Sequence, residues 1–344
     1  MKKILIVKLS AIGDVVHTLP VCASIRKKFP SAEISWIVEE MASDLLVGNP
    51  NIDKVIISPR RSVIAEFKRG HFLLAYRLTK DFLRQIRQMG TYDIAIDIHG
   101  LLKSALIMFF IKAKRKIGYN SMQEFSGLFY NEKIFEDMSK HAVDRYLDFA
   151  TYLGVGSIMP DFFIPASAET KATAKNILER NGIKDGEQFV VISPTALWET
   201  KLWQNEQFAL LADMIITKLG MKVVLTGSYS HECVEIENMS VKNKIINLAG
   251  QTTLLELAEI CRQAKVVVST DSGAMHIASA VGVPIIAIFG PTDPKLTGPY
   301  GKNSVVIKSS VACSPCLKKK CSDKKCMKEI SAERVFFAIR DEIL

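Results

Sequence analysis

A polar turn late in the chain is the stretch best suited to chemistry. Residues 266–269 have the apolar, β-branched pattern of a buried strand, and residues 270–273 form a polar turn before a helical pattern at 274–280. Small turn residues let a ligand approach the backbone, and a helix amino terminus offers unpaired N–H groups and a positive dipole. The alternative is that Asp271 or Ser272 only caps the helix. The pattern indicates a seat for an anion such as phosphate.

A second strand–turn–helix pattern opens the chain and places an aspartate at its turn. Gly13 permits a tight turn after the strand of residues 4–9, and Asp14 follows it at the start of a helix. Asp14 is then either a favoured helix cap or a general base. In the second case the helix dipole would keep the carboxylate ionised, and partial burial would raise its proton affinity. Neither Gly-x-Gly-x-x-Gly nor Gly-Lys-Ser/Thr occurs in the chain, which disfavours NAD binding and P-loop nucleotide hydrolysis.

A third candidate is Lys201, in the loop that follows the apolar residues 189–192. A lysine in such a loop can neutralise a diphosphate leaving group, whereas the plainer interpretation is an exposed loop lysine. In open α/β sheets, ligands bind beyond the carboxyl ends of the strands. Asp14, Lys201 and the turn at 270–273 all occupy such positions.

These three positions belong to two runs of alternating strands and helices. In the first run we expect strands at residues 4–9, 33–38, 54–57 and 92–98, and helices at residues 20–29 and 72–88. In the second run we expect strands at residues 189–192, 222–226, 266–269 and 284–289, and helices at residues 208–218 and 254–264. Such alternation is typical of a doubly wound parallel sheet with helices on both faces.

An extended segment at residues 159–165 separates the two runs, and its two prolines are typical of an interdomain linker. We therefore expect an α/β protein with one domain over residues 1–163, a second over residues 164–330, and a cleft between them. A closing helix at residues 331–344 is expected to pack back on the first domain.

Length and composition restrict the class of protein. The chain has 344 residues, of which 48% are hydrophobic, enough for two cores. The apolar run at residues 105–111 is too short to cross a membrane and the first residues lack the features of a signal peptide, so we expect a cytoplasmic protein. The net charge of +9, concentrated in the basic stretch at residues 60–87, favours anionic partners. Nucleic acid is disfavoured because no known nucleic-acid-binding pattern occurs.

Five blocks in order along the chain resemble glycosyltransferase family 9, the ADP-heptose:lipopolysaccharide heptosyltransferases. They lie at residues 8–20, 97–104, 200–203, 271–276 and 289–294. Shorter stretches at residues 36–40, 128–131 and 141–145 are most similar to heptosyltransferase I, which adds the first heptose to Kdo. The resemblance implies the GT-B fold of two Rossmann-like domains, with the acceptor in the first and the nucleotide sugar in the second. It also implies an inverting transfer with no covalent intermediate.

The resemblance assigns a role to each candidate residue. Asp14 would take the proton from an acceptor hydroxyl, whose oxygen attacks the anomeric carbon of ADP-heptose as ADP leaves. The implied donor site comprises Thr195, Lys201, Glu232, Asp271, Ser272, Gly273 and His276. The implied acceptor site comprises Ser10, Arg60, Arg61, Lys103 and Arg145. No metal is required, because Lys201 and the helix amino terminus would carry the charge that Mg²⁺ usually bears.

The implied acceptor is Kdo-lipid A, whose carboxylates and phosphates suit a basic first domain. Such an enzyme would meet the cytoplasmic face of the inner membrane peripherally, through basic charge. The run at residues 105–111 is either an apolar edge for that contact or, as we favour, a buried helix. Heptosyltransferase II, another sugar or acceptor, and a nucleotide-sugar-binding pseudoenzyme remain as alternatives. The presence of both Asp14 and Lys201 argues against the pseudoenzyme.

Four of the seven cysteines cluster near the carboxyl terminus and depart from the heptosyltransferase I pattern. Cys313 and Cys316 have ligand-like C-x₂-C spacing and precede Cys321 and Cys326. Four thiolates would suit a structural zinc ion or an iron–sulfur cluster. The alternative is four reduced thiols in a basic surface loop, since a second C-x₂-C pair is absent. The three other cysteines are isolated and expected in the core.

Overall fold

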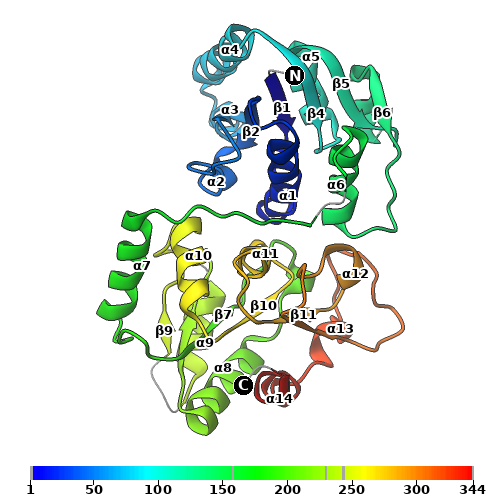
Figure 1. The fold of residues 1–344 in the computed structure, drawn as a ribbon. Helices are drawn as coiled ribbons and strands as arrows, with labels where there is room; N and C mark the ends of the chain where they lie inside the picture. Colours follow the sequence, from blue (N-terminus) through cyan, green and yellow to red (C-terminus); the bar gives the residue numbers. More distant parts are fainter. Residues whose placement is uncertain (1–2, 122, 157–158, 229–230, 242–244, 343–344) are drawn as a thin grey trace. The chain divides into compact units, whose positions relative to one another are not determined.

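The computed structural model divides the chain into two compact units (Figure 1). Unit 1 is Met1–Pro165 and unit 2 is Ala166–Leu344. The structure describes residues 3–121, 123–156, 159–228, 231–241 and 245–342. The boundary lies at the end of the proline-bracketed segment, just beyond the predicted division at residue 163.

Unit 1 is built on a parallel sheet of six strands in the order β3-β2-β1-β4-β5-β6. The strands are β1 (Lys3–Val7), β2 (Glu33–Glu39), β3 (Lys54–Ser58), β4 (Thr91–Asp97), β5 (Lys112–Tyr119) and β6 (Glu132–Ile134). The central strand β1 pairs with both β2 and β4, and its residues from Ile4 to Val7 are buried. The strand order reverses at β1, so ligands are expected beyond its carboxyl end.

The helices of unit 1 follow its strands along the chain. They are α1 (Ile12–Lys28), α2 (Glu40–Ser43), α3 (Arg60–Lys68), α4 (Phe72–Gln88), α5 (Leu102–Phe110) and α6 (Ala142–Tyr152), with a 3₁₀ segment at Gln123–Phe129. The bounds of α4 are those predicted, whereas α1 begins well before residue 20 and contains Pro20. Pro20 is buried, so the packing of α1 offsets the backbone hydrogen bond that a proline cannot donate.

The edge of unit 1 differs from the predicted pattern. The apolar run at residues 105–111 forms most of α5, in which Ala105 and Met108 are buried while Phe109 is 61% exposed. Strands β5 and β6 are not predicted by the alternation, because β5 begins with charged residues (Lys-Ala-Lys-Arg-Lys) and β6 is only three residues long. A strand near a sheet edge tolerates such charges, since its side chains reach water.

Unit 2 repeats the plan with a parallel sheet in the order β12-β11-β10-β7-β8-β9. The strands are β7 (Phe189–Ser193), β8 (Lys222–Leu225), β9 (Ile246–Asn247), β10 (Val266–Thr270), β11 (Ile285–Phe289) and β12 (Ser304–Lys308). Every residue of β7, β10 and β11 is buried. Their continuous apolar sequences are typical of parallel strands covered on both faces.

The helices of unit 2 include the closing helix of the chain. They are α7 (Ala168–Arg180), α8 (Asn205–Met214), α9 (His231–Met239), α10 (Leu254–Gln263), α11 (Gly273–Ala280), α12 (Pro294–Thr297), α13 (Lys325–Lys328) and α14 (Ala332–Glu342). The closing helix α14 packs against α8, β11 and β12, and lies beside α8 in Figure 1. Its Val335, Phe336 and Ile339 belong to the apolar core of unit 2. The helix therefore completes the core of unit 2.

Candidate active site

Asp14 lies in the first turn of α1, beyond the carboxyl end of β1. Its Oδ1 accepts a hydrogen bond from the Tyr146 hydroxyl (2.7 Å) and lies 3.6 Å from Lys8 Nζ. Its Oδ2 accepts a hydrogen bond from the backbone N–H of Ala11 (3.1 Å), so one oxygen also closes the start of the helix. The side chain of Asp14 is still 40% exposed, which leaves the carboxylate fixed yet accessible.

Lys8 is the cation that lies next to the Asp14 carboxylate. It is buried, and its Nζ donates hydrogen bonds to the Tyr146 hydroxyl (2.8 Å) and the Ile98 carbonyl (3.4 Å). Burial lowers the pKa of Lys8, with Asp14 opposing the shift. Desolvation acts to raise the pKa of Asp14, but Lys8 and Tyr146 outweigh it and hold that pKa well below its ordinary value. The predicted rise in the proton affinity of Asp14 is therefore reversed.

Lys8 and Tyr146 are not among the site residues predicted from the sequence. The available signal for Lys8 was a lysine interrupting an apolar strand, since a buried lysine requires an anionic or polar partner. Tyr146 lies on α6, which packs beside α1. Nothing local in the sequence marks this tyrosine, because its contact with Asp14 spans 132 residues.

Three cations near Asp14 form what we call the basic wall: Arg60, Arg61 and Lys103. With Ser10 they make up four of the five predicted acceptor residues. Arg60 Nη1 and Arg61 Nε lie 3.0 and 3.1 Å from the two carboxylate oxygens of Glu39, a buried residue that ends β2. Lys103 Nζ donates a hydrogen bond to the Ser10 hydroxyl (3.1 Å). Burial lowers the pKa of Lys103, Glu39 opposes this, and both arginines lower it further. The buried Glu39 therefore anchors a cluster of cations that suits an anionic ligand.

His99 is a neighbour of these cations that sequence analysis quoted within a block but gave no role. Neither of its ring nitrogens has a hydrogen-bond partner among the described residues. Burial, then Lys8 and Lys103, lower the pKa of His99 to about 3, so the imidazole is neutral. The loop before it is held by Asp97, which accepts hydrogen bonds from the backbone N–H groups of His99 and Gly100 and from the Tyr130 hydroxyl.

Arg145, the fifth predicted acceptor residue, is placed differently. Its guanidinium lies 5.7 Å from the centre of the Tyr146 ring and its Nε lies 3.7 Å from a Glu136 oxygen. Its charge lowers the pKa of Lys8, so it belongs to the same electrostatic neighbourhood as Asp14. Its contacts are those of a residue that supports Tyr146.

In unit 2, the predicted donor residues Lys201 and Asp271 form an ion pair. Lys201 ends a short 3₁₀ turn after β7, and its Nζ lies 2.7 Å from Asp271 Oδ2, beyond the carboxyl end of β10. The Thr292 hydroxyl donates a hydrogen bond to the same oxygen (2.7 Å). Asp271 is 5% exposed and Lys201 16%, so the interpretation of Lys201 as an exposed loop lysine is wrong.

The indole ring of Trp198 carries two cations. Lys201 Nζ lies 4.5 Å and Lys319 Nζ 5.2 Å from the ring centre. Stacking a cation on an aromatic face restricts the lysine without adding a negative charge. Lys201 is therefore held by an aromatic ring and one carboxylate, and it keeps ammonium hydrogens for an incoming anion.

The predicted anion seat lies at the start of α11. Ser272 is the N-cap residue, yet its side chain makes no capping hydrogen bond. Its hydroxyl lies 3.2 Å from that of Ser269, and Asp271 binds Lys201 instead of capping the helix. The capping alternative is thus wrong for both residues, while Gly273 begins the helix and His276 is buried within it.

Thr195 and Glu232 complete the predicted donor residues. The Thr195 carbonyl accepts a hydrogen bond from the Thr270 hydroxyl (3.3 Å), which ties the β7 loop to the end of β10. Gly227 approaches Thr195 so closely, at a φ of +146°, that a Cβ atom there would lie 2.7 Å from the threonine hydroxyl. Glu232 lies at the start of α9, after β8, and the structure gives it no contact with Lys201 or Asp271.

The cysteine segment borders the Lys201 loop. All four cysteines of this segment, residues 313–326, are free thiols. Cys313 and Cys321 are exposed, and Cys326 is buried. Among the residues that the structure describes, no group of three or more His, Cys, Asp or Glu side chains is placed to hold a metal ion. The four-cysteine metal site therefore has no preformed geometry here and stays a prediction. Lys324 Nζ of this segment lies 2.7 Å from Glu199, two residues before Lys201.

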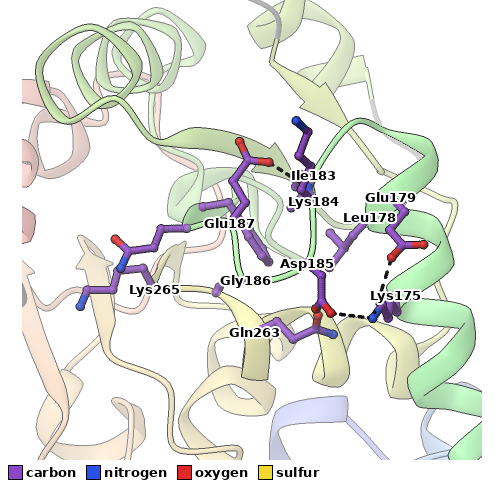
Figure 2. A pocket seen from close by; sticks show the side chains of 13 residues that line it. Lys175, Leu178, Glu179, Ile183, Lys184, Asp185, Gly186, Glu187, Gln263 and Lys265 are labelled. Carbon is purple, nitrogen blue, oxygen red and sulfur yellow. Dashed lines mark hydrogen bonds and ion pairs between the residues drawn. The ribbon is translucent and has the colours of Figure 1, made fainter.

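One hollow in unit 2 lies away from these residues. Figure 2 shows a cavity of about 410 Å³ lined by the residues that precede β7 and β10, at the amino ends of the strands. Three of its charged side chains pair with one another, as Lys175 lies 2.8 Å from Asp185 and 3.9 Å from Glu179. Ligands of α/β sheets bind at the opposite, carboxyl edge, where Lys201 and Asp271 lie.

Two parallel sheets, each with a polar site at its carboxyl edge, are the architecture of the GT-B fold, and comparisons with known proteins supply the class of enzyme. Residues 80–327 match the model of glycosyltransferase family 9 (heptosyltransferase). The chain is 29% identical over 311 residues to lipopolysaccharide heptosyltransferase 1 of Escherichia coli K12, covering 89% of this chain and 93% of the relative. It is also 29% identical over 322 residues to lipooligosaccharide heptosyltransferase 2 of Haemophilus influenzae, covering 89% and 88%.

Solved structures extend this similarity to the fold. E. coli heptosyltransferase WaaC with ADP superimposes with a TM-score of 0.80 at 26% identity, covering 98% of this chain and 99% of the other. The same enzyme with ADP-2-deoxy-2-fluoro heptose gives 0.77 at 26% identity, covering 99% of each chain. The protein belongs to glycosyltransferase family 9, and the predicted GT-B fold and enzyme class are confirmed. No helix within the described residues is long and apolar enough to cross a membrane.

Proposed function

We propose that this protein transfers L-glycero-D-manno-heptose from ADP-heptose to Kdo of the lipopolysaccharide inner core, with Kdo-lipid A as acceptor. The single observation that carries the proposal is the accessible Asp14 carboxylate, fixed by Tyr146, Lys8 and Ala11 at the switch point of the unit 1 sheet. The family relationship supports the sugar, and the relatives named as heptosyltransferase 1 support the acceptor.

Asp14 acts as general base in this proposal. As the acceptor oxygen forms its bond to the anomeric carbon, its proton passes to Asp14, and the bond from that carbon to the ADP oxygen breaks with its electron pair on ADP. Attack opposite the leaving group inverts the anomeric centre. The low pKa of Asp14 makes it a weak base at rest. This is sufficient because the hydroxyl becomes strongly acidic only as the new bond forms.

Lys201 and the amino terminus of α11 bind the donor diphosphate in this proposal. Lys201 Nζ would exchange part of its contact with Asp271 for phosphate oxygens, and the N–H groups that follow Ser272 would bind others. Both groups stabilise the charge that grows on ADP as it leaves. On this basis we propose that the transfer requires no metal ion, with Thr195, Glu232 and His276 lining the rest of the donor site.

The basic wall binds the acceptor in this proposal. Arg60, Arg61 and Lys103 would meet the carboxylates of Kdo, with the Ser10 hydroxyl bonded to Lys103. Arginine side chains suit bidentate binding of carboxylates, and Glu39 orients both of them beforehand. We further propose that the enzyme works on the cytoplasmic face of the inner membrane, as a peripheral protein, because its acceptor is a lipid.

The direct test is to incubate the purified protein with ADP-heptose and Kdo-lipid A and follow the acceptor by mass spectrometry. We expect the mass of one heptose to be added, and Asp14→Asn to abolish the gain while Asp44→Asn, an exposed aspartate of the same unit, retains it. If only an acceptor that already carries one heptose is extended, the function is that of heptosyltransferase II, the second candidate, to which the H. influenzae relative named heptosyltransferase 2 is 29% identical. If neither acceptor reacts while ADP binds, the proposed acceptor is wrong.

A further inference from the structure

The hairpin of α3 and α4 exposes large apolar side chains that the core of unit 1 does not cover. They are Ile64, Phe67, Phe72, Leu73, Leu74 and Tyr76. Leu73 is 77% exposed, and the rings of Phe67 and Phe72 meet edge to face at 5.0 Å across the turn between the helices. An exposed apolar cluster of this kind marks an interaction surface.

The same hairpin is strongly basic. Residues 60–88 contain eight lysines and arginines but only two carboxylates, Glu66 and Asp81. Glu66 pairs with Arg69 and Asp81 with Arg84. Four further cations have no carboxylate within 4 Å among the described residues: Lys68, Arg77, Lys80 and Arg87. The surface therefore offers apolar rings together with uncompensated positive charge.

A hollow along α4 combines both features. It has a volume of about 370 Å³ and is lined by Tyr76, Thr79, Lys80, Leu83, Arg84, Arg87 and Gln88. Lys80 Nζ lies 5.9 Å from the Tyr76 ring centre, so a cation and an aromatic face lie together. This arrangement suits an anionic headgroup beside the first carbons of a lipid chain.

We infer that the hairpin of residues 60–88 docks the enzyme on an anionic lipid bilayer. Phe67, Phe72, Leu73 and Tyr76 enter the headgroup region, and the unpaired cations meet lipid phosphates. Charge complementarity selects this occupant. A second copy of the chain would bring the same positive surface against itself, which like charges oppose.

The apolar run of α5, the edge considered in the sequence analysis, is a weaker candidate. Leu106 and Phe109 are exposed there, but Lys103 is the only cation of the helix, and it is engaged with Ser10. Basic residues follow at the start of β5, but Lys114 pairs with Asp93 and Arg115 with Glu132, which leaves less uncompensated positive charge for anionic lipid than in the hairpin. The two helices thus supply a matched comparison within one unit.

The hairpin also begins at the proposed acceptor wall. Arg60 and Arg61 open α3 and bind Glu39, and the exposed rings follow within the next helical turns. Docking by this surface would bring a lipid-linked acceptor to the basic wall. That consequence rests on the proposed function, whereas the docking itself does not.

The test is flotation of the full-length protein with vesicles of phosphatidylethanolamine and phosphatidylglycerol, compared with phosphatidylcholine alone. We expect binding to the anionic vesicles, weakened by salt, and roughly tenfold weaker binding in Phe72→Ser/Leu73→Ser. Lys80→Gln/Arg87→Gln should weaken it similarly and removes no apolar contact, so it serves if the first variant misfolds. The matched control, Leu106→Ser/Phe109→Ser, should bind as the parent protein does.

Several outcomes would overturn the inference. They are failure of the parent protein to bind anionic vesicles, binding unchanged in both hairpin variants, or a loss confined to the α5 variant. A solution dimer dissociated by Phe72→Ser/Leu73→Ser would assign the surface to a second copy, and equal affinity for duplex DNA would remove the preference for lipid. Turnover with a detergent-dispersed acceptor separates this test from that of the proposed function, because the hairpin variants should retain it.

Discussion

Each unit holds one aspartate and one lysine at the carboxyl edge of its sheet, but the two pairs are built in opposite ways. In unit 1 the lysine is buried and the carboxylate is exposed: the side chains of Lys8 and Asp14 are 5% and 40% exposed. In unit 2 the carboxylate is the more buried member, with Asp271 at 5% and Lys201 at 16%. A hydroxyl completes each arrangement, from Tyr146 in one and Thr292 in the other.

The difference indicates which group each unit presents to a ligand. Unit 1 fixes a cation inside and presents a carboxylate, as a proton acceptor requires. Unit 2 fixes a carboxylate inside and leaves the cation as the more accessible member, as a diphosphate site requires. Under the proposed function, the same pair of residue types would serve two kinds of chemistry, according to which member is buried.

The strongest test of this comparison removes the charge of each aspartate in turn. Asp14→Asn should lower kcat by about 10³-fold or more, since a general base is lost, and leave the Kd for ADP unchanged. Asp271→Asn should mainly change the affinity for ADP, because its role is to hold Lys201. Steady-state kinetics with ADP titration calorimetry checks both. If the two variants lose turnover equally while binding ADP normally, the division of roles is wrong.

Removing the cation of unit 2 should have the next largest effect. Lys201→Met keeps much of the length of the side chain but loses its charge-assisted bonds to phosphate, so ADP affinity should fall by about 10- to 100-fold. Lys319→Met, which removes the other cation on Trp198, is the matched control and should change it far less. Equal losses in the two variants would make the tryptophan face, and not the Asp271 pair, the basis of binding.

Removing the cation of unit 1 should change the pH dependence. Because Lys8 is the largest of the groups that lower the pKa of Asp14, Lys8→Met should let that pKa rise toward its ordinary value. The parent kcat/KM should then stay level as the pH falls through about 4, whereas the variant should lose activity there. His99 does not produce this limb, since its pKa is lowered to about 3. Superimposable profiles would contradict the role of Lys8.

Most of the fold was predictable because apolar periodicity records burial. The central strands β1, β7, β10 and β11 are continuous apolar runs, and the structure places them within one or two residues of the predicted ends. Strand β5 was not predicted from the sequence, because its lysines and arginine reach water near a sheet edge and break the apolar pattern. The start of α1 before Pro20 was not predicted either, because a proline inside a helix depends on tertiary packing, which a local sequence pattern does not contain.

The site was predictable to the extent that its residues lie in strand–turn–helix junctions. Asp14, Lys201 and Asp271 follow strands directly, so the sheet topology gathers each at a carboxyl edge. Their partners Tyr146 and Thr292 come from other elements, and their importance arises only from contacts across the fold. The direction of the Asp14 pKa shift was also beyond the sequence, because it depends on how deeply Lys8 is buried.

The cysteine segment tests whether the Lys201 pair has outside support. Lys324 of this segment pairs with Glu199, and the Lys318 carbonyl accepts a hydrogen bond from the Thr200 hydroxyl (2.7 Å), so the segment touches the loop that carries Lys201. If the four-cysteine prediction holds, anaerobically purified protein contains about one zinc ion or the iron of one cluster per chain, lost in Cys316→Ser. Metal loss should then weaken ADP binding only a few-fold. Parent protein without metal would refute the site.

The two hydroxyl partners offer the finest test, because each variant deletes one oxygen and little else. Tyr146→Phe removes a hydrogen bond to Asp14, so kcat should fall by about 3- to 10-fold, with ADP affinity unchanged. Thr292→Val removes the matching bond to Asp271 and should weaken ADP binding by a similar factor, with kcat unchanged at saturating donor. One variant should therefore change kcat alone, and the other should change ADP affinity alone. If a hydroxyl has only a structural role, its removal should lower the free energy of unfolding without a selective change in kcat or in ADP affinity. Steady-state kinetics and urea unfolding of both variants therefore decide whether burial alone distinguishes the two sites.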